Sequence, residues 1–224
     1  MRPLIIVRPK PAAGATAAAA SELGLEPVVM PLFQIRPLAW SAPDPARFEG
    51  LLLTSANTIR HGGTELQQLR GLPVFAVGEA TAAEARDSGF TIALVGGGGV
   101  DELLAKVDPG LQLLHVGGEE RREPGTAPQS ITHLAAYRAE QVADVEGLER
   151  IEGAVVALHS PRAAARLAEL AATSRTDISR TALAAISAET ARSAGAGWQT
   201  VETAEAPGDA TLLALAKRLC QNPG

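Results

Sequence analysis

Two short segments of the chain each place a hydroxyl side chain where a run of apolar residues ends. The segment LLLTSAN covers residues 51–57, and VALHSPR covers residues 156–162. A serine or threonine at such a position can cap the following helix, and the backbone N–H groups of a helix start can bind an anion without a lysine. For Thr54, Ser55 and Ser160, a capping role and a ligand-binding role are therefore both open.

The same kind of turn occurs at two further places, in the segments GEATA and SAETA. Gly78 and Thr81 belong to the first segment, and Ser187 and Thr190 occupy the matching positions 109 residues further on. The serines of the first pair of turns are 105 residues apart. Similar turns at nearly constant spacing indicate that the chain contains a duplicated unit.

The segments around these turns alternate between strand and helix patterns. Short apolar runs predict buried strands, and segments that end at a glycine predict helices. The helix after the strand at 51–57 is expected to cover residues 58–69. The predicted strand–helix segments are 3–24, 51–69, 72–90, 91–107, 154–170, 181–198 and 199–219. This alternation predicts an α/β fold with parallel sheets and helices on both faces.

Two further segments, 31–38 and 133–142, are predicted to be extended. Each sits at the same place in its repeat, so we expect the two segments to pair as a two-stranded antiparallel hinge between two lobes. Parallel sheets bind ligands at the carboxyl ends of their strands. The turns with Ser55 and Ser160 are therefore expected to line opposite walls of a cleft.

No cofactor or metal motif accompanies these turns. The glycine run at 96–99 lacks the spacing of a dinucleotide fingerprint and the lysine of a P-loop, so we interpret it as a flexible loop. The four histidines lack the spacing of a metal site. His159 precedes Ser160, but a nucleophile elbow is missing, so we interpret His159 as a plain strand-end residue. We expect neither a cofactor nor a metal.

Composition excludes several other classes of protein. Hydrophobic residues make up 46% of the chain, and the net charge is −5 without a basic patch, which argues against nucleic-acid binding. Cys220 is the only cysteine, so a disulfide within the chain is excluded and a reducing compartment is favoured. The apolar run near the N-terminus is too short for a secretory signal or a membrane span. We therefore expect a cytoplasmic protein.

Taken together, these segments resemble the uroporphyrinogen-III synthase family over nearly the whole chain. Each motif alone is short, and their order and spacing carry the resemblance. The segments are VRP at 7–9, LLLTSANTIR at 51–60, VFAVGEATAAEARDSGF at 74–90, AAYRAEQV at 135–142, LHSPRAAARL at 158–167, AAISAETARSAGAGW at 184–198 and AEAPGDATLLALA at 204–216.

The resemblance implies two flavodoxin-like lobes joined by a two-stranded ladder. One lobe would be discontinuous and formed by residues 1–34 and 142–224, and the other would cover residues 39–133. Residues 35–38 and 134–141 would be the linker strands.

The resemblance also implies a reaction of heme biosynthesis. The linear tetrapyrrole hydroxymethylbilane would lose its terminal hydroxyl as water, and its last pyrrole ring would be inverted as the macrocycle closes to uroporphyrinogen III. The route would pass through an azafulvene and a spiro intermediate, without a cofactor or metal. The expected partners are this substrate and, transiently, the upstream synthase, and the protein is expected to be a monomer.

The same resemblance implies roles for individual residues. The family's crossover tyrosine aligns with Tyr137, which is expected to give a proton or a hydrogen bond to the leaving hydroxyl, with packing at the hinge as the alternative role. The family's turn threonines align with Thr81 and Thr190, and its strand-end serine aligns with Ser55. The expected substrate contacts are Arg8, Thr54, Ser55, Asn57, Gly78, Thr81, Ser160, Arg162, Ser187 and Thr190.

The chain also departs from the family's pattern. Asn57 stands where some relatives have a cation, and Ser187 stands where a glycine is common. The segment 117–130 is short, so a helix there is expected to be reduced or lost, which puts contacts from Arg121 and Arg122 in doubt. Arg60 and Arg138 also lie near the strand ends, where either solvation or carboxylate binding is open. The alternative functions are a non-catalytic two-lobed small-molecule binding protein and a flavin or nucleotide binder.

Overall fold

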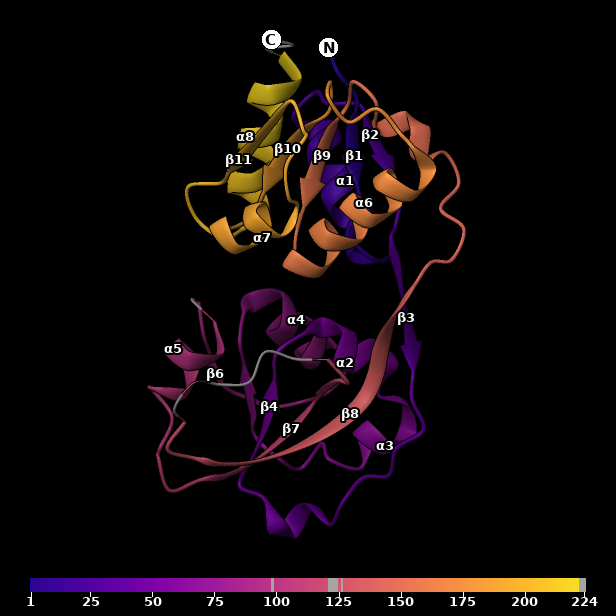
Figure 1. Ribbon diagram of the computed structural model, residues 1–224. Coiled ribbons are helices and arrows are strands. Elements are labelled where there is room, and N and C mark those ends of the chain that lie inside the picture. The colour runs from indigo at the N-terminus through magenta and orange to yellow at the C-terminus, as the bar shows by residue number, and fades with distance from the viewer. Residues whose placement is uncertain (98, 121–124, 126, 222–224) are drawn as a thin grey trace. The chain divides into compact units, whose positions relative to one another are not determined.

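The computed structural model describes residues 1–97, 99–120, 125 and 127–221 (Figure 1). The chain forms two compact units. Unit 1 consists of Met1–Gln34 and Gln141–Gly224, and unit 2 consists of Ile35–Glu140. No helix among the described residues is both long enough and apolar enough to cross a membrane.

Unit 1 is built on a five-stranded sheet in which every pair of neighbouring strands is parallel. The strand order is β2-β1-β9-β10-β11, which is the flavodoxin order 2-1-3-4-5 when the strands are counted along the unit. The strands are β1 (Leu4–Ile6), β2 (Pro27–Val29), β9 (Val155–Leu158), β10 (Ala182–Ala185) and β11 (Thr200–Thr203).

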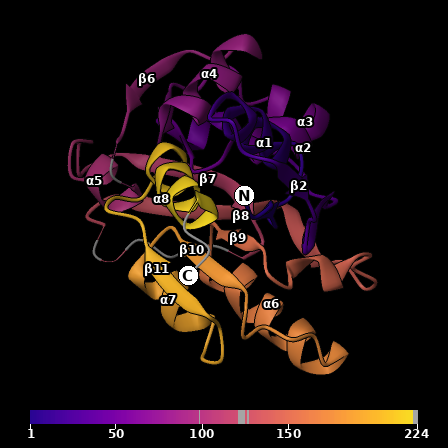
Figure 2. The ribbon, with the colours of Figure 1, turned by 90° about the horizontal axis from the view of Figure 1, so that it is seen from above.

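Helices cover both faces of this sheet. The helices are α1 (Ala12–Glu22), α6 (Pro161–Ser174), α7 (Ala188–Ser193) and α8 (Asp209–Gln221), with a short 3-10 turn η2 (Leu148–Ile151). Helices α1 and α8 share one apolar core with alternate residues of β1, β9 and β10. Figure 2 shows α8 on one side of β9–β11 and α6 and α7 on the other. Burial from both sides explains why β1, β9 and β10 are apolar at every position.

Unit 2 contains a six-stranded sheet in the order β3-β8-β7-β4-β5-β6. Its strands are β3 (Phe33–Pro37), β4 (Gly50–Leu53), β5 (Val74–Ala76), β6 (Ile92–Val95), β7 (Gln112–Gly118) and β8 (Ser130–Gln141). The five strands from β8 to β6 are mutually parallel. Counted from β7, they repeat the order 2-1-3-4-5 of unit 1, but β4–β6 come before β7 and β8 in the chain.

The sheet of unit 2 is also covered on both faces. The helices are α2 (Ala56–His61), α3 (Gly63–Gln67), α4 (Glu79–Asp87) and α5 (Val100–Leu104), with a 3-10 turn η1 (Pro45–Arg47). Residues of α2 to α4 pack in one apolar cluster, and Leu103 and Leu104 of α5 pack in a second cluster with Leu52, Phe75 and Leu113. The prediction of an α/β fold with parallel sheets in two units is confirmed.

Strands β3 and β8 run antiparallel, as two hydrogen bonds show. Leu38 N–H donates to the Ala136 carbonyl at 2.9 Å, and Val142 N–H donates to the Leu32 carbonyl at 3.0 Å. The antiparallel pairing is as expected, but β8 is also a full member of the parallel sheet through its pairing with β7. The role of residues 35–38 and 134–141 as linker strands, and the expected lobe boundaries, stay predictions.

One predicted helix is wrong in its extent. The sequence predicts a single helix over residues 58–69, but α2 ends at His61 and α3 begins at Gly63. Gly63 has a φ of +64°, a left-handed conformation that interrupts the helix and that glycine adopts without steric cost. The expected loss of a helix at 117–130 falls largely on residues 121–124 and 126, which lie outside the described residues, as do Arg121 and Arg122.

Candidate functional site

The carboxyl edge of each sheet collects the side chains that the sequence singled out. In unit 1 the strand order reverses between β1 and β9, and in unit 2 it reverses between β7 and β4. Such a reversal opens a crevice at the carboxyl ends of the strands, where α/β sheets bind ligands. Arg8 follows β1, Ser160 follows β9, and Thr54 and Ser55 follow β4.

Three of the expected serines are helix caps. Ser55 Oγ accepts from Asn57 N at 3.2 Å at the start of α2. Ser160 Oγ accepts from Ala163 N at 3.2 Å at the start of α6, and Ser187 Oγ accepts from Thr190 N at 3.2 Å at the start of α7. Each cap fixes a helix start at the carboxyl edge of its sheet. The remaining backbone N–H groups of such a helix start suit an anion.

The two turn threonines point inward. Thr81 is 6% exposed and Thr190 is fully buried. The Thr190 hydroxyl lies 3.0 Å from Ser187 Oγ, so it belongs to the cap of α7. Gly78 and Ser187 are the half-buried residues of these turns. A substrate contact from either threonine stays a prediction.

One histidine of a pair on neighbouring strands contacts the Thr54 hydroxyl. His115 lies on β7 directly opposite His133 on β8, and their Nδ1 atoms are 3.3 Å apart. The Nε2 atom of His115 lies 3.1 Å from Thr54 Oγ1, so both ring nitrogens of His115 are engaged. A side chain at Gly117 would collide with this ring, because a Cβ there would lie 2.8 Å from His115 Nε2. Sequence reasoning missed His115, because its partners lie on neighbouring strands.

Tyr137 lies on β8 opposite Gly118, against which its ring packs. A Cβ at Gly118 would lie 3.1 Å from Tyr137 Cε2, so a larger residue there would crowd the ring. Tyr137 is 9% exposed, and its hydroxyl makes no hydrogen bond to any described residue. The ring of His61 is 6.2 Å away between centroids. Burial lowers the pKa of His61, and the charge of Arg60 lowers it further.

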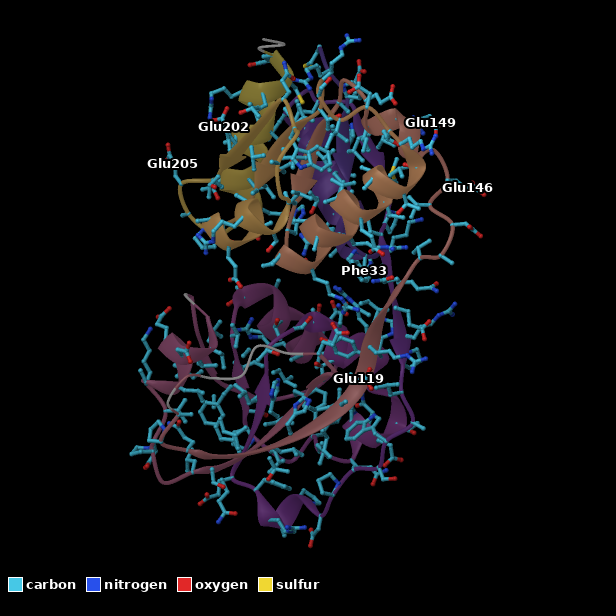
Figure 3. All side chains as sticks on the ribbon, in the orientation of Figure 1. Phe33, Glu119, Glu146, Glu149, Glu202 and Glu205 are labelled. Carbon is cyan, nitrogen blue, oxygen red and sulfur yellow. The ribbon has the colours of Figure 1, made fainter. Side chains whose placement is uncertain are left out.

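The cations near these edges differ in what they contact. Arg60 forms an ion pair with Glu84 of α4, and Arg138 forms one with Glu140. The guanidinium of Arg162, in the first turn of α6, lies 4.5 Å from the centre of the Phe33 ring, and Phe33 is the first residue of β3 (Figure 3). Stacking on an aromatic ring fixes the plane of the Arg162 guanidinium.

Arg8 belongs to a network of polar side chains that the sequence did not reveal. Its Nη1 atom donates to Asp209 Oδ1 at 3.1 Å and to Thr16 Oγ1 at 3.1 Å. Thr16 Oγ1 donates to Asp209 Oδ2 at 2.6 Å, and His159 Nε2 lies 2.8 Å from Asp209 Oδ1. The interpretation of His159 as a plain strand-end residue is therefore wrong, because its ring is bound to the carboxylate that begins α8.

The network stabilises the charged form of Asp209. Burial by itself raises the pKa of this carboxyl, but the hydrogen bonds from His159 and Thr16 and the charges of His159 and Arg8 outweigh burial and lower the pKa from 3.8 to about 2. The described residues hold no group of three or more metal-ligating side chains that could bind an ion. The two edges provide hydroxyl groups, helix starts and guanidinium groups, which are the kinds of group that can bind carboxylates.

The fold and these edges define a class: an α/β protein of two flavodoxin-ordered units with capped helix starts at the carboxyl edges of their sheets. A family model described as Uroporphyrinogen-III synthase HemD matches residues 14–214. The chain belongs to the uroporphyrinogen-III synthase family.

Individual relatives agree with this family. A uroporphyrinogen-III synthase of Chlorobaculum parvum is 32% identical over 101 residues, and the match spans 41% of this chain and 41% of that protein. The crystal structure of uroporphyrinogen-III synthetase from Helicobacter pylori superposes with a TM-score of 0.66 at 16% identity, covering 98% of this chain and 100% of that one. A mutant uroporphyrinogen III synthase of Thermus thermophilus gives a TM-score of 0.54, also at 16% identity, covering 98% and 100%. These two structures support the fold.

Proposed function

We propose that the protein is a uroporphyrinogen-III synthase that cyclises hydroxymethylbilane, inverts the terminal pyrrole ring and releases water in heme biosynthesis. The observation that carries this proposal is the match of the family model to residues 14–214. The hydroxyl groups and helix starts at both sheet edges support it, because the substrate is a polycarboxylate.

The reaction requires one C–O bond of the substrate to break. The terminal hydroxyl departs as water and therefore needs a proton or a strong hydrogen bond at its oxygen. Tyr137 is the proposed donor, since its hydroxyl makes no hydrogen bond within the described residues. The substrate is intrinsically reactive, so positioning of its terminal ring contributes more to the outcome than acid–base strength does.

We propose that the carboxyl edge of each unit binds carboxylates of the substrate. In unit 2 the proposed contacts are Thr54, Ser55, Asn57, Gly78 and Thr81. In unit 1 they are Arg8, Ser160, Arg162, Ser187 and Thr190. The helix starts that Ser55 and Ser160 cap provide backbone N–H donors for this purpose. No cofactor is assigned a role in this proposal, and a cytoplasmic monomer that takes its substrate from the upstream synthase is part of it.

A product assay tests the proposal directly. Hydroxymethylbilane is generated in place by the upstream synthase, and the type I and type III products are separated after oxidation. We expect type III product well above the spontaneous background. If only type I product forms with folded protein, the activity is absent, and a non-catalytic binding protein of the same fold becomes the better explanation.

A further inference from the structure

The guanidinium of Arg8 makes hydrogen bonds to described residues through only one of its three nitrogens. Both hydrogen bonds that hold it come from Nη1, to Thr16 and to Asp209. Among the described residues, the Nε and Nη2 donors of Arg8 have no hydrogen-bond partner, and the side chain is 30% exposed. The Nε–Nη2 edge of a guanidinium is a planar fork that binds a carboxylate through two parallel hydrogen bonds.

Asp209 holds Arg8 without covering this fork. Both of its oxygens are already occupied, Oδ1 by Arg8 and His159, and Oδ2 by Thr16. The two supporting side chains are rigidly placed, because Thr16 is fully buried and the His159 side chain is 7% exposed. Asp209 therefore holds Nη1 in a fixed position. The Nε–Nη2 edge of the guanidinium stays available for a ligand carboxylate.

The position of this arrangement in the sheet suits a ligand. Arg8 is the second residue after β1, and His159 is the first residue after β9, the neighbour of β1 in the sheet. These two strands flank the point where the strand order of unit 1 reverses. The fork therefore lies at the edge of the sheet where α/β proteins bind ligands.

We infer that Arg8 binds one carboxylate of the substrate through its Nε–Nη2 edge, and that Asp209, held by His159 and Thr16, is the residue that positions it. The inference rests on the proposed function for the identity of the ligand, a carboxylate side chain of the tetrapyrrole. It adds two positioning residues, Asp209 and His159, which act on the substrate only through Arg8.

Steady-state kinetics with hydroxymethylbilane separate binding from chemistry. Arg8→Ala is expected to raise KM about 10- to 100-fold, the loss of a charge-assisted bidentate contact. Arg8→Lys is expected to raise KM nearly as much, because an ammonium keeps the charge but lacks the fork. Asp209→Ala is expected to raise KM roughly 3- to 10-fold with little change in kcat, because the guanidinium loses its fixed orientation.

Two substitutions at His159 distinguish positioning from a general structural role. His159→Gln keeps an N–H donor that can reach Asp209 and is expected to hold KM within about 2-fold of the parent. His159→Ala removes the donor and is expected to behave like Asp209→Ala. Arg218→Ala is the matched control, because it breaks an exposed ion pair between α8 and Glu202, away from Arg8, and is expected to leave KM unchanged.

Direct binding of uroporphyrin III, a stable octacarboxylate, gives a readout that does not depend on turnover. Fluorescence titration is expected to show weaker binding for Arg8→Ala and Asp209→Ala in the same order as the KM values. Unchanged KM and unchanged uroporphyrin binding in both folded variants would overturn the inference, and so would tighter binding in Asp209→Ala, which would mark Asp209 as a competitor. If Asp209→Ala does not fold, the KM values of Arg8→Lys, His159→Gln and His159→Ala test the inference instead.

The inference and the proposed function fail in different ways. If the parent protein forms only type I product, the proposed function is wrong, whether or not the variants bind uroporphyrin. If the parent forms type III product but the variants match it in KM and binding, the activity stands and the role of Arg8 and Asp209 is refuted.

Discussion

The low pKa of Asp209 predicts how much this residue contributes to the free energy of unfolding of unit 1. The carboxyl has an ordinary pKa of 3.8 and one of about 2 in the folded protein. A difference of this size corresponds to roughly 2.5 kcal/mol if the group is fully screened from water. The Asp209 side chain is 39% exposed, so solvent screening reduces the contribution to about 1 kcal/mol.

The sign of the pH dependence follows from the direction of the change. The folded-state pKa lies below the unfolded one, so the contribution is complete above about pH 4 and is lost as the pH falls through about 2. Asp209→Asn removes this contribution at every pH. We expect the variant to melt about 2–4 °C below the parent at pH 7, and we expect the two melting curves to converge between pH 4 and pH 2.

Thermal unfolding followed by circular dichroism at pH 7, 5, 4, 3 and 2 measures this difference. Because the chain has two units, the transition must be assigned to unit 1. Trp198 is buried in unit 1, and its fluorescence reports on that unit once Trp40, which lies in unit 2, has been replaced by Phe in every variant. Arg218→Ala serves as a control for loss of an exposed ion pair and is expected to change the melting temperature by less than about 1 °C. A difference for Asp209→Asn that is absent at pH 7, or that persists undiminished at pH 3 and below, would refute this account of the network.

Three further substitutions test other parts of the structure. Tyr137→Phe is expected to lower kcat several-fold with little effect on melting, as measured in the type III assay; an unchanged kcat would assign Tyr137 to packing. Gly50→Ala is expected to destabilise unit 2 by about 1–3 kcal/mol in urea unfolding, because a Cβ there would lie 2.4 Å from Phe75 Cε2. Arg2→Ala is expected to destabilise unit 1 by about 2 kcal/mol in the same experiment, because Arg2 donates to the Gly153 and Ala154 carbonyls at 2.7 and 2.8 Å. Destabilisation below about 0.5 kcal/mol would contradict either of the last two expectations.

The fold class was predictable because its signals are local. Strands buried on both faces read as continuous apolar runs, and each capping serine marks the helix that follows. The duplication reinforced both signals by repeating them. The break between α2 and α3 was missed because the apolar pattern continues across Gly62 and Gly63, and only the left-handed conformation of Gly63 stops the helix.

The candidate site was predictable only in part. Hydroxyl and glycine turns at strand ends can be recognised from sequence, but which side of a turn faces solvent depends on packing, as the burial of Thr190 shows. The contact between Arg8 and Asp209 could not be predicted from the sequence, because the two residues are 201 positions apart in the chain. His159 and Asp209 are 50 residues apart, and neither has a distinctive spacing that would indicate the contact.

The division of the chain between the units has a consequence for biosynthesis on the ribosome. Unit 2 is contiguous, so it can fold once residue 140 has left the exit tunnel. Strand β1 must wait for its neighbour β9, which is made about 150 residues later. During that interval an apolar strand edge stays without its partner, which is the condition that invites aggregation. A nascent chain that stalls shortly after residue 140 has emerged from the tunnel would carry a folded unit 2 and an N-terminal segment prone to aggregation, so this stage should depend most on chaperones.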